Sequence, residues 1–291
     1  MCRRYVALKT ANLVTYGSGR IFCKMKKIGF IGIGNMGGAI LEAVAKKLPG
    51  DEIMVCDHNG DKTARASAKY GCIVSSANEI AENSEYLMIC VKPQAAASAF
   101  AEIADTLSAR SKPPIIVSIM AGVSIEAVST MARVKCHVIR IMPNVAASIG
   151  ESMTLCATGS EVSDNELNEF LDFMSESGKI DIIPEKLIDA SSALSGCGPA
   201  YVCMFVEALA DGAVECGVPR KNAMEYALRT LIGTAKLIEE TGKHPGLIKD
   251  EVTSPSGTTI EGVRALERGA FRSSVSEAVI AAYEKTMKLK K

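Results

Sequence analysis

The sequence predicts an α/β protein: a doubly wound, largely apolar sheet followed by an all-helical region. Three observations support this fold class. A glycine-rich turn joins a strand to a helix near the start, short apolar strands alternate with helices as far as about Pro184, and the strand signal then stops. The chain has 291 residues, 48% of them hydrophobic, which is enough for two domains with a sizeable core.

The glycine-rich turn organises the rest of the chain. Apolar residues typical of a strand run from Ile28 to Ile33, and an apolar helical stretch follows the glycines. Gly32, Gly34 and Gly37 fit the pattern G-x-G-x-x-G, in which the glycines allow a sharp turn, close approach of a pyrophosphate and close helix packing. A glycine-rich turn without a ligand is the alternative. The strand before it and the helix after it favour dinucleotide binding in a Rossmann-type sheet.

The strands and helices that follow predict a parallel sheet with both faces covered. We expect strands at 53–56, 73–74, 86–91, 115–119, 138–141 and 153–157, and helices at 62–70, 78–83, 95–108, 124–131 and 164–177. Ligands of such sheets bind outside the carboxyl ends of the strands. One crevice is therefore expected to be lined by the loops 32–37, 57–62, 91–94, 120–123 and 142–144.

The last third of the chain is expected to be helical. Helices are predicted at 187–194, 199–216, 219–240 and 271–289. The segment 199–216 is apolar nearly all round, and a helix of that kind needs burial on every side. Because so short a region cannot bury it alone, the sequence predicts oligomerisation through the helical half.

Composition excludes several functional classes. The 33 basic and 33 acidic side chains cancel, so a nucleic-acid partner is not favoured, and the sequence has no apolar run of 18 residues, so no membrane span is expected. The ten cysteines form no C-x-x-C pair and the three histidines are dispersed, which argues against a metal site and favours reduced thiols in a cytoplasmic protein.

Residues 1–24 stand apart, because they are basic and the first acidic residue of the chain is Glu42. They fit either a transit peptide or, as we prefer, an upstream extension before a natural start at Met25. We expect them to lie outside the fold.

Asp57 ends the second predicted strand, in the position where an acidic residue binds a ribose 2′-hydroxyl and repels a 2′-phosphate. It could equally be a turn-forming aspartate, and Lys62 is close enough in sequence to receive a 2′-phosphate. The sequence therefore leans only slightly toward NADH over NADPH.

The loop 252–263 is a second feature that could bind a ligand. Thr258 and Glu261 match a capping box, which is the structural explanation. Alternatively, the N–H groups of Thr258 and Thr259 at a helix start, with a threonine hydroxyl, form a carboxylate site. The pattern alone leaves the two explanations even.

Five motifs occur in a fixed order: GFIGIGNMG at 29–37, VKPQ at 91–94, MPN at 142–144, SGCGPAY at 195–201 and TSPSGTTI at 253–260. Together they resemble the pyrroline-5-carboxylate reductase family from residue 25 to about 288, and the last two motifs are the most specific. The resemblance implies a Rossmann domain at 25–184 and a helical dimerisation and substrate domain at 185–291. It also implies dimers that assemble into decamers, and reduction of 1-pyrroline-5-carboxylate to L-proline, the last step of proline synthesis, with NADPH or NADH.

The resemblance also assigns site residues. Cofactor contacts, to which Asp57 is added from its position, are expected at Ile31, Gly32, Gly34, Asn35, Met36, Asp57, Asn78, Cys90, Val91, Lys92, Pro93, Met120 and Ala121. Gly257, Thr258 and Thr259 are expected to bind the substrate carboxylate, with Thr259 as the catalytic residue, and no metal is expected. Three residues depart from the family pattern: Cys197 replaces a serine, Ser256 replaces a glycine, and Asp57 replaces a small hydroxyl residue.

Two other functions fit part of the sequence. A 3-hydroxyacid dehydrogenase shares the glycine-rich start, but that family's catalytic lysine has no counterpart in the segment 199–216. A dinucleotide-binding sensor without turnover would not need the second anion site in the helical half.

Overall fold

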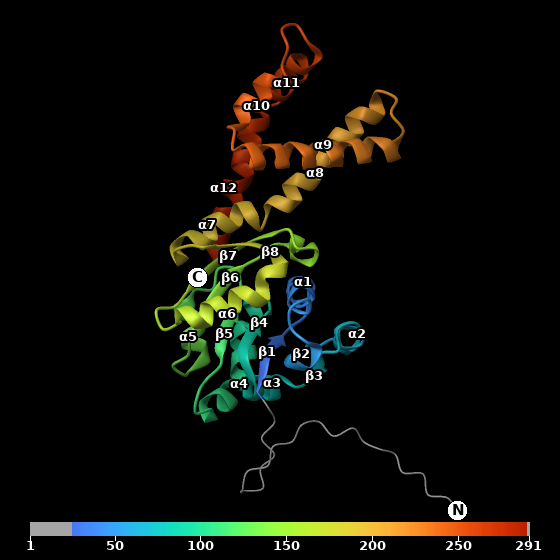
Figure 1. Cartoon of the computed structure of the whole chain (residues 1–291). Coiled ribbons are helices and arrows are strands. Elements are labelled where there is room, and N and C mark those ends of the chain that lie inside the picture. The colour runs from blue at the N-terminus through green and yellow to red at the C-terminus, as the bar shows by residue number, and fades with distance from the viewer. Residues whose placement is uncertain (1–24, 290–291) are drawn as a thin grey trace, which may run out of the picture.

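The computed structural model describes residues 25–289, so the predicted extension at 1–24 lies outside the described part of the chain. A sheet with helices on both faces forms one half of the molecule. The helical region rises from one end of this sheet (Figure 1). The switch from strands to helices falls between Ile182 and Glu185.

The sheet has eight strands in the order β3-β2-β1-β4-β5-β6-β7-β8. Their bounds are β1 Lys26–Ile31, β2 Ile53–Cys56, β3 Ile73–Val74, β4 Ser84–Ile89, β5 Ile115–Ser118, β6 Val138–Met142, β7 Ser152–Thr158 and β8 Gly178–Ile182. All neighbouring strands are parallel except β6 and β7, which are antiparallel.

The expectation of a wholly parallel sheet is therefore wrong at one edge. Only the short 3₁₀ turn η3, Val145–Ile149, lies between β6 and β7, and a parallel connection needs a crossover of roughly a dozen residues or more. Strand β8 was not predicted from the sequence. Its GKIDI sequence is short and largely exposed at the sheet edge, so it lacks the apolar run that marks the central strands.

The described helices match the predicted ones closely, with one addition. Around the sheet lie α1 Asn35–Val44, α2 Gly60–Tyr70, α3 Ala77–Asn83, α4 Ala96–Ala109, α5 Ile125–Ala132 and α6 Asp164–Met174, with 3₁₀ turns η1 Gly50–Glu52, η2 Pro93–Ala95 and η4 Ser175–Ser177. The helical region contains α7 Glu185–Ser195, α8 Gly198–Glu215, α9 Arg220–Thr241, α10 Pro245–Glu251, α11 Thr258–Arg268 and α12 Phe271–Leu289. Helix α10, two turns that begin at a proline, was not predicted.

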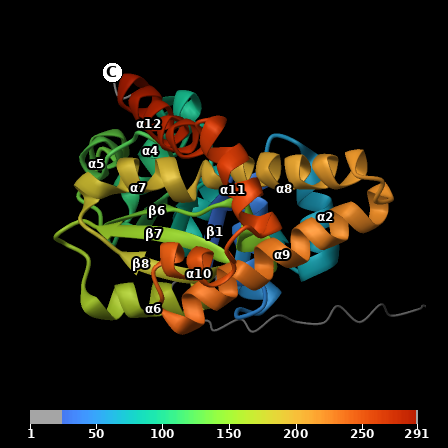
Figure 2. The ribbon, with the colours of Figure 1, turned by 90° about the horizontal axis from the view of Figure 1, so that it is seen from above.

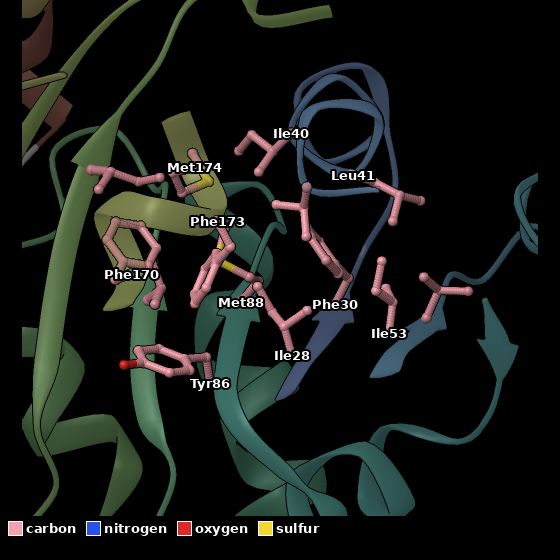
Figure 3. Close-up of a cluster of buried hydrophobic side chains, with 14 of the residues drawn as sticks. Ile28, Phe30, Ile40, Leu41, Ile53, Tyr86, Met88, Phe170, Phe173 and Met174 are labelled. Atoms are coloured by element: carbon pink, nitrogen blue, oxygen red, sulfur yellow. The ribbon is translucent and has the colours of Figure 1, made fainter. Parts of the chain in front are cut away.

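Two apolar clusters fix the sheet, one on each face, because side chains alternate along a strand. In β1, Ile28 and Phe30 face α1 and α6, where they meet Phe170 and Phe173 (Figure 3). Ile31 points to the opposite face, toward α3, α4 and α5. With both faces packed, the carboxyl ends of the strands are held in fixed positions.

The helical region buries little of its own apolar surface. Its cluster between α8 and α9 consists of Val206, Ala210, Ala223 and Ala227. Large apolar side chains such as Met204, 70% exposed, and Tyr226, 57% exposed, lie on its surface. The stretch Glu185–Glu215 contains an 18-residue window with a mean hydropathy of 1.4, so by length and composition alone it could cross a membrane, although it has no unbroken apolar run of that length. Figure 2 shows that this stretch is two helices, α7 across β6 and β7 and then α8 leading away.

Candidate active site

The glycine-rich turn has the geometry of a phosphate cradle. Gly32 has φ +93°, and a Cβ atom there would lie 2.8 Å from the Cys90 carbonyl oxygen. A Cβ atom at Gly37 would lie 2.4 Å from the Gly32 carbonyl oxygen, whereas one at Gly34 would meet nothing within 4 Å. No side chain caps the N-terminus of α1. At the first and third glycines there is therefore no room for a side chain, whereas the space beside the second glycine is free. Together with the uncapped N–H groups at the start of α1, this free space suits a dinucleotide diphosphate.

A cleft of about 830 Å³ lies over this turn. It is formed by the carboxyl ends of β1, β2, β4, β5 and β6 and by the connection from α7 to α8, so all five predicted loops contribute to it. Its lining consists of Gly32, Gly34, Asn35, Met36, Gly37, Asp57, His58, Lys62, Cys90, Val91, Lys92, Pro93, Ala95, Ile119, Met120, Ala121, Met142, Pro143, Ser192, Gly196 and Cys197.

Two residues predicted to bind the cofactor do not line the cleft. The Ile31 side chain is 6% exposed and packs in the core between the sheet and α3 to α5, because strand alternation turns it away from the cleft. Asn78 lies in the first turn of α3, and its Oδ1 accepts a hydrogen bond from Thr106 Oγ1 at 2.6 Å. Ser192, Gly196 and Cys197 line the cleft but were not predicted as site residues; Gly196 and Cys197 belong to the 195–201 motif, which was used only to recognise the family.

Asp57 lies at the cleft and is also part of the glycine-rich turn. Its Oδ2 accepts a hydrogen bond from the Ile33 N–H at 2.9 Å, and its Oδ1 accepts one from the Asn59 N–H at 2.9 Å. Burial opposes ionisation, but these two bonds, with the charges of Lys62 and His58, hold the pKa of the carboxyl below its usual value. Asp57 therefore carries a fixed negative charge in the cleft.

Replacing this carboxylate should change the choice of cofactor. Asp57→Ser is expected to raise kcat/KM for NADPH relative to NADH by about tenfold or more, because the repulsion of a 2′-phosphate is removed while Lys62 remains. The ratio of the two rates measures the effect. Asp61→Ser is the control, because it removes a nearby carboxylate that does not line the cleft. It should leave the ratio of the two rates unchanged. An unchanged ratio in both variants would exclude Asp57 from cofactor selection.

The loop before α11 differs from its predicted structure. Gly257, with φ −78° and ψ 172°, is the N-cap of α11, and the helix start has no side-chain cap. Thr258 is instead the first helical residue, and the Glu261 carboxylate pairs with Arg264. The predicted capping box is therefore wrong. Thr258 and Thr259 are exposed at an uncapped helix start.

This loop does not lie at the cleft of its own chain. Figure 1 shows α10 and α11 at the far end of the helical region, beyond α8 and α9 and well away from β1 and α1. Gly257, Thr258 and Thr259 are absent from the cleft lining. The structure thus brings all the predicted dinucleotide residues except Ile31 and Asn78 to one cleft, and it places the predicted substrate residues away from that cleft.

Comparison with known proteins decides the family. The family model described as pyrroline-5-carboxylate reductase dimerisation matches residues 185–289, and that described as NADP oxidoreductase, coenzyme F420-dependent, matches residues 27–122. Pyrroline-5-carboxylate reductase of Synechocystis is 41% identical over 268 residues, which are 91% of this chain and 98% of the relative. The chain belongs to the pyrroline-5-carboxylate reductase family.

Other members of the family agree in sequence and in fold. The pyrroline-5-carboxylate reductase of Arabidopsis thaliana is 36% identical, over 90% of this chain and 95% of the relative. The crystal structure of Plasmodium falciparum pyrroline carboxylate reductase with NADP bound superposes with a TM-score of 0.83 at 28% identity, covering 91% of this chain and 98% of that one.

The first of the three functions considered from the sequence is thereby confirmed. The chain is an NAD(P)H-dependent oxidoreductase that reduces pyrroline-5-carboxylate to proline, and its dimerisation domain makes it a homo-oligomer. Neither the hydroxyacid dehydrogenase nor the sensor accounts for a dimerisation domain of pyrroline-5-carboxylate reductase type.

Ser256, one of the three residues that depart from the pattern expected from the resemblance, adopts a left-handed conformation with φ +59°. For a residue with a Cβ atom, that conformation is about 1 kcal/mol less favourable than the right-handed one. Ser256→Gly is therefore expected to raise the free energy of unfolding by up to about 1 kcal/mol, and kcat should be kept because the turn is kept. Denaturant unfolding measures the gain. A destabilised variant would show that the hydroxyl makes a compensating contact.

Proposed function

We propose that reduction takes place in a site shared by two subunits, in which one chain supplies the dinucleotide cleft and its partner supplies the Gly257–Thr259 loop. One observation carries the proposal. The chain contains a dinucleotide-sized cleft and an exposed, uncapped helix start at Thr258 and Thr259, but it holds them at opposite ends (Figure 1). A face-to-face dimer is the simplest arrangement that brings them together.

In the cleft, we assign the diphosphate to the uncapped N–H groups that begin α1, and the adenosine ribose to the region of Asp57. The nicotinamide end then lies against Met120 and Ala121, beside the Met142–Pro143 turn at the end of the neighbouring strand β6. When bound, NAD(P)H supplies the hydride that adds to the imine carbon. The protein orients the dinucleotide and excludes water around the acceptor.

At the partner's loop, the Thr258 and Thr259 N–H groups and hydroxyls hold the substrate carboxylate. A protonated imine is already a strong electrophile, so the chemistry needs no strongly acidic side chain. We infer that Thr259 contributes by fixing the ring over the nicotinamide, which makes positioning the main source of rate enhancement.

We further infer that a second copy of the chain, rather than a lipid bilayer, covers the exposed apolar face of the helical region. Helix α8 carries carboxylates at Glu207, Asp211 and Glu215, three turns along one side, and such a row would be costly in hydrocarbon. We propose that the dimers assemble into decamers and that the protein is cytoplasmic, where the eight free cysteines of the described residues would stay reduced. Light scattering of the purified chain without detergent measures the assembly directly.

The activity is tested by mixing the purified full-length chain with pyrroline-5-carboxylate and following the oxidation of NADH and NADPH in parallel. We expect oxidation together with formation of L-proline, and the ratio of the two rates gives the cofactor preference. Failure to oxidise either dinucleotide, with both substrate and cofactor shown to be intact, would overturn the proposed function.

The shared site is tested by mixing two impaired subunits and assaying them with substrate and NADPH near their wild-type KM values, where each variant alone has little activity. Gly37→Ala weakens dinucleotide binding in the cleft, and the double variant Thr258→Val/Thr259→Val weakens carboxylate binding at the loop. After unfolding and refolding together, they should regain about a quarter of the wild-type activity, because half of the dimers are mixed and each has one intact site of two. If each chain forms its own site, the mixture will stay as weakly active as the variants alone.

A further inference from the structure

A cluster of three charges, two of them buried and one half-buried, lies where the helical region meets the sheet. The Arg140 side chain on β6 is 1% exposed. Its Nη2 donates to Asp189 Oδ1 at 2.6 Å, and its Nη1 donates to Glu185 Oε1 at 3.1 Å. Both carboxylates belong to α7. A guanidinium is buried at such a cost that it persists only with partners of this kind.

The cluster also reaches a third element. Glu185 Oε1 accepts a hydrogen bond from the Ile125 N–H at 2.7 Å, at the first residue of α5. Helix α5 follows the loop that contains Met120 and Ala121. One carboxylate oxygen therefore joins β6, α5 and α7.

These three elements build the same end of the cleft. The loop before α5 contributes Met120 and Ala121, the end of β6 contributes Met142 and Pro143, and the end of α7 contributes Ser192 and Gly196. A second polar contact between the sheet and α7 lies close to the cleft, where Asn144 Nδ2 donates to the Ser195 carbonyl oxygen at 3.0 Å. The charged cluster and this bond hold α7 at its two ends.

Apolar packing alone would leave the position of α7 poorly defined. The buried contact between α7 and the sheet consists of Ile188 with Met142, Leu155 and Ala157. Contacts of this type are non-directional, so they define the register of α7 across β6 and β7 less sharply than directed bonds do (Figure 2). Charge-assisted hydrogen bonds have defined distances and angles, and they fix the register of α7 on the sheet.

We propose that Arg140 is a positioning residue for hydride transfer: with Glu185 and Asp189 it sets the place of α7 and thereby the geometry of the nicotinamide end of the cleft. This inference rests on the placement of the nicotinamide given under the proposed function. It assigns Arg140 no contact with substrate or dinucleotide, since Arg140 does not line the cleft.

The test replaces the charges by apolar groups of similar size. Exchanges of this kind are often neutral for stability, so the double variant Arg140→Met/Asp189→Leu is expected to fold. We expect kcat with pyrroline-5-carboxylate to fall about tenfold or more, and the kinetic isotope effect with NADPH deuterated at the transferred position to rise, because hydride transfer becomes rate-limiting. The Kd for NADPH, measured by fluorescence, should change less than about twofold, because the diphosphate and ribose contacts lie at the other end of the cleft.

Arg110→Met is the matched control. Arg110 Nη1 donates to the carbonyl oxygens of Ala81 and Ser84, away from the cleft. Its loss should lower the free energy of unfolding and leave the isotope effect of the folded fraction unchanged. The pair of variants separates a loss of stability from a loss of geometry.

An unchanged kcat and isotope effect in the folded double variant would overturn the proposal. If that variant does not fold, Asp189→Asn decides: it keeps the shape of the side chain and removes its charge, and the same rise in isotope effect is expected. If the wild-type chain itself fails to oxidise NADPH with pyrroline-5-carboxylate, that result disproves the proposed function. The positioning role of Arg140 is disproved only by an active wild-type chain and an unchanged variant.

Discussion

Replacing Thr258 and Thr259 together by valine is expected to raise KM for pyrroline-5-carboxylate by about 100-fold and to leave KM for NADPH unchanged. Valine keeps the shape of threonine and removes the hydroxyl. A hydrogen bond to a charged group contributes roughly 1.5–3 kcal/mol, and each ~1.4 kcal/mol is a factor of ten in affinity. Steady-state kinetics with each substrate varied in turn measures both constants.

The neighbouring Thr253 provides a control in the same loop. Its Oγ1 donates to the Lys249 carbonyl oxygen at 2.6 Å, so this hydroxyl serves the structure of α10. Thr253→Val should lower stability while KM for pyrroline-5-carboxylate stays within about twofold. Equal KM changes in the two variants would mean that loop structure, and not the threonine hydroxyls at the start of α11, accounts for the effect.

Gly37→Ala is expected to reduce NADPH affinity by about 100-fold or more, with a matching loss of kcat/KM. The added methyl would lie 2.4 Å from the Gly32 carbonyl oxygen and 2.9 Å from the Cys90 Cβ. Because the first of these is backbone, α1 must shift away from β1, and the N–H groups at its start move from their positions. NADPH fluorescence titration measures the loss.

The next residue along α1 gives the comparison. A methyl group at Gly38 would come no closer than 3.7 Å to the Ile33 carbonyl oxygen, which is an ordinary contact. Gly38→Ala should therefore bind NADPH normally and gain slight stability from the better helix former. Normal binding by Gly37→Ala would show that the turn adapts and that G-x-G-x-x-G is not required here.

The nucleotide-binding half was predictable because its signals are local. The glycines at 32 and 37 each have a steric reason in the structure and the space beside Gly34 is open. The carboxyl ends of the strands form the crevice that the alternation of strands and helices predicted. The position of Ile31 followed from strand alternation and could have been excluded from the cleft by the same reasoning. The place of Asn78 could not have been predicted in this way, because its side chain bonds to the Thr106 hydroxyl, which belongs to another helix.

The features that were missed depend on contacts distant in sequence. The reversal at β7 follows from a connection too short for a crossover, and the apolar pattern of Met153 to Ala157 is the same in either direction. Gly257 is the N-cap of α11 and Thr258 its first residue, since the turn before the helix brings Gly257 against Ser254. The burial of Arg140 has no signature in its own strand, because both partners lie more than 40 residues away.

The uneven distribution of buried surface has a consequence for how the protein matures in the cell. The sheet half closes its two apolar clusters within one chain, whereas α8 to α12 leave side chains such as Met204 and Leu247 in solvent. A newly made subunit therefore passes through a stage in which the nucleotide-binding half is folded and the helical half still exposes apolar surface that is prone to aggregation. Chaperone capture, or loss to aggregation, competes with pairing at that stage. The yield of enzyme should therefore depend on how quickly subunits meet as well as on how stable each one is.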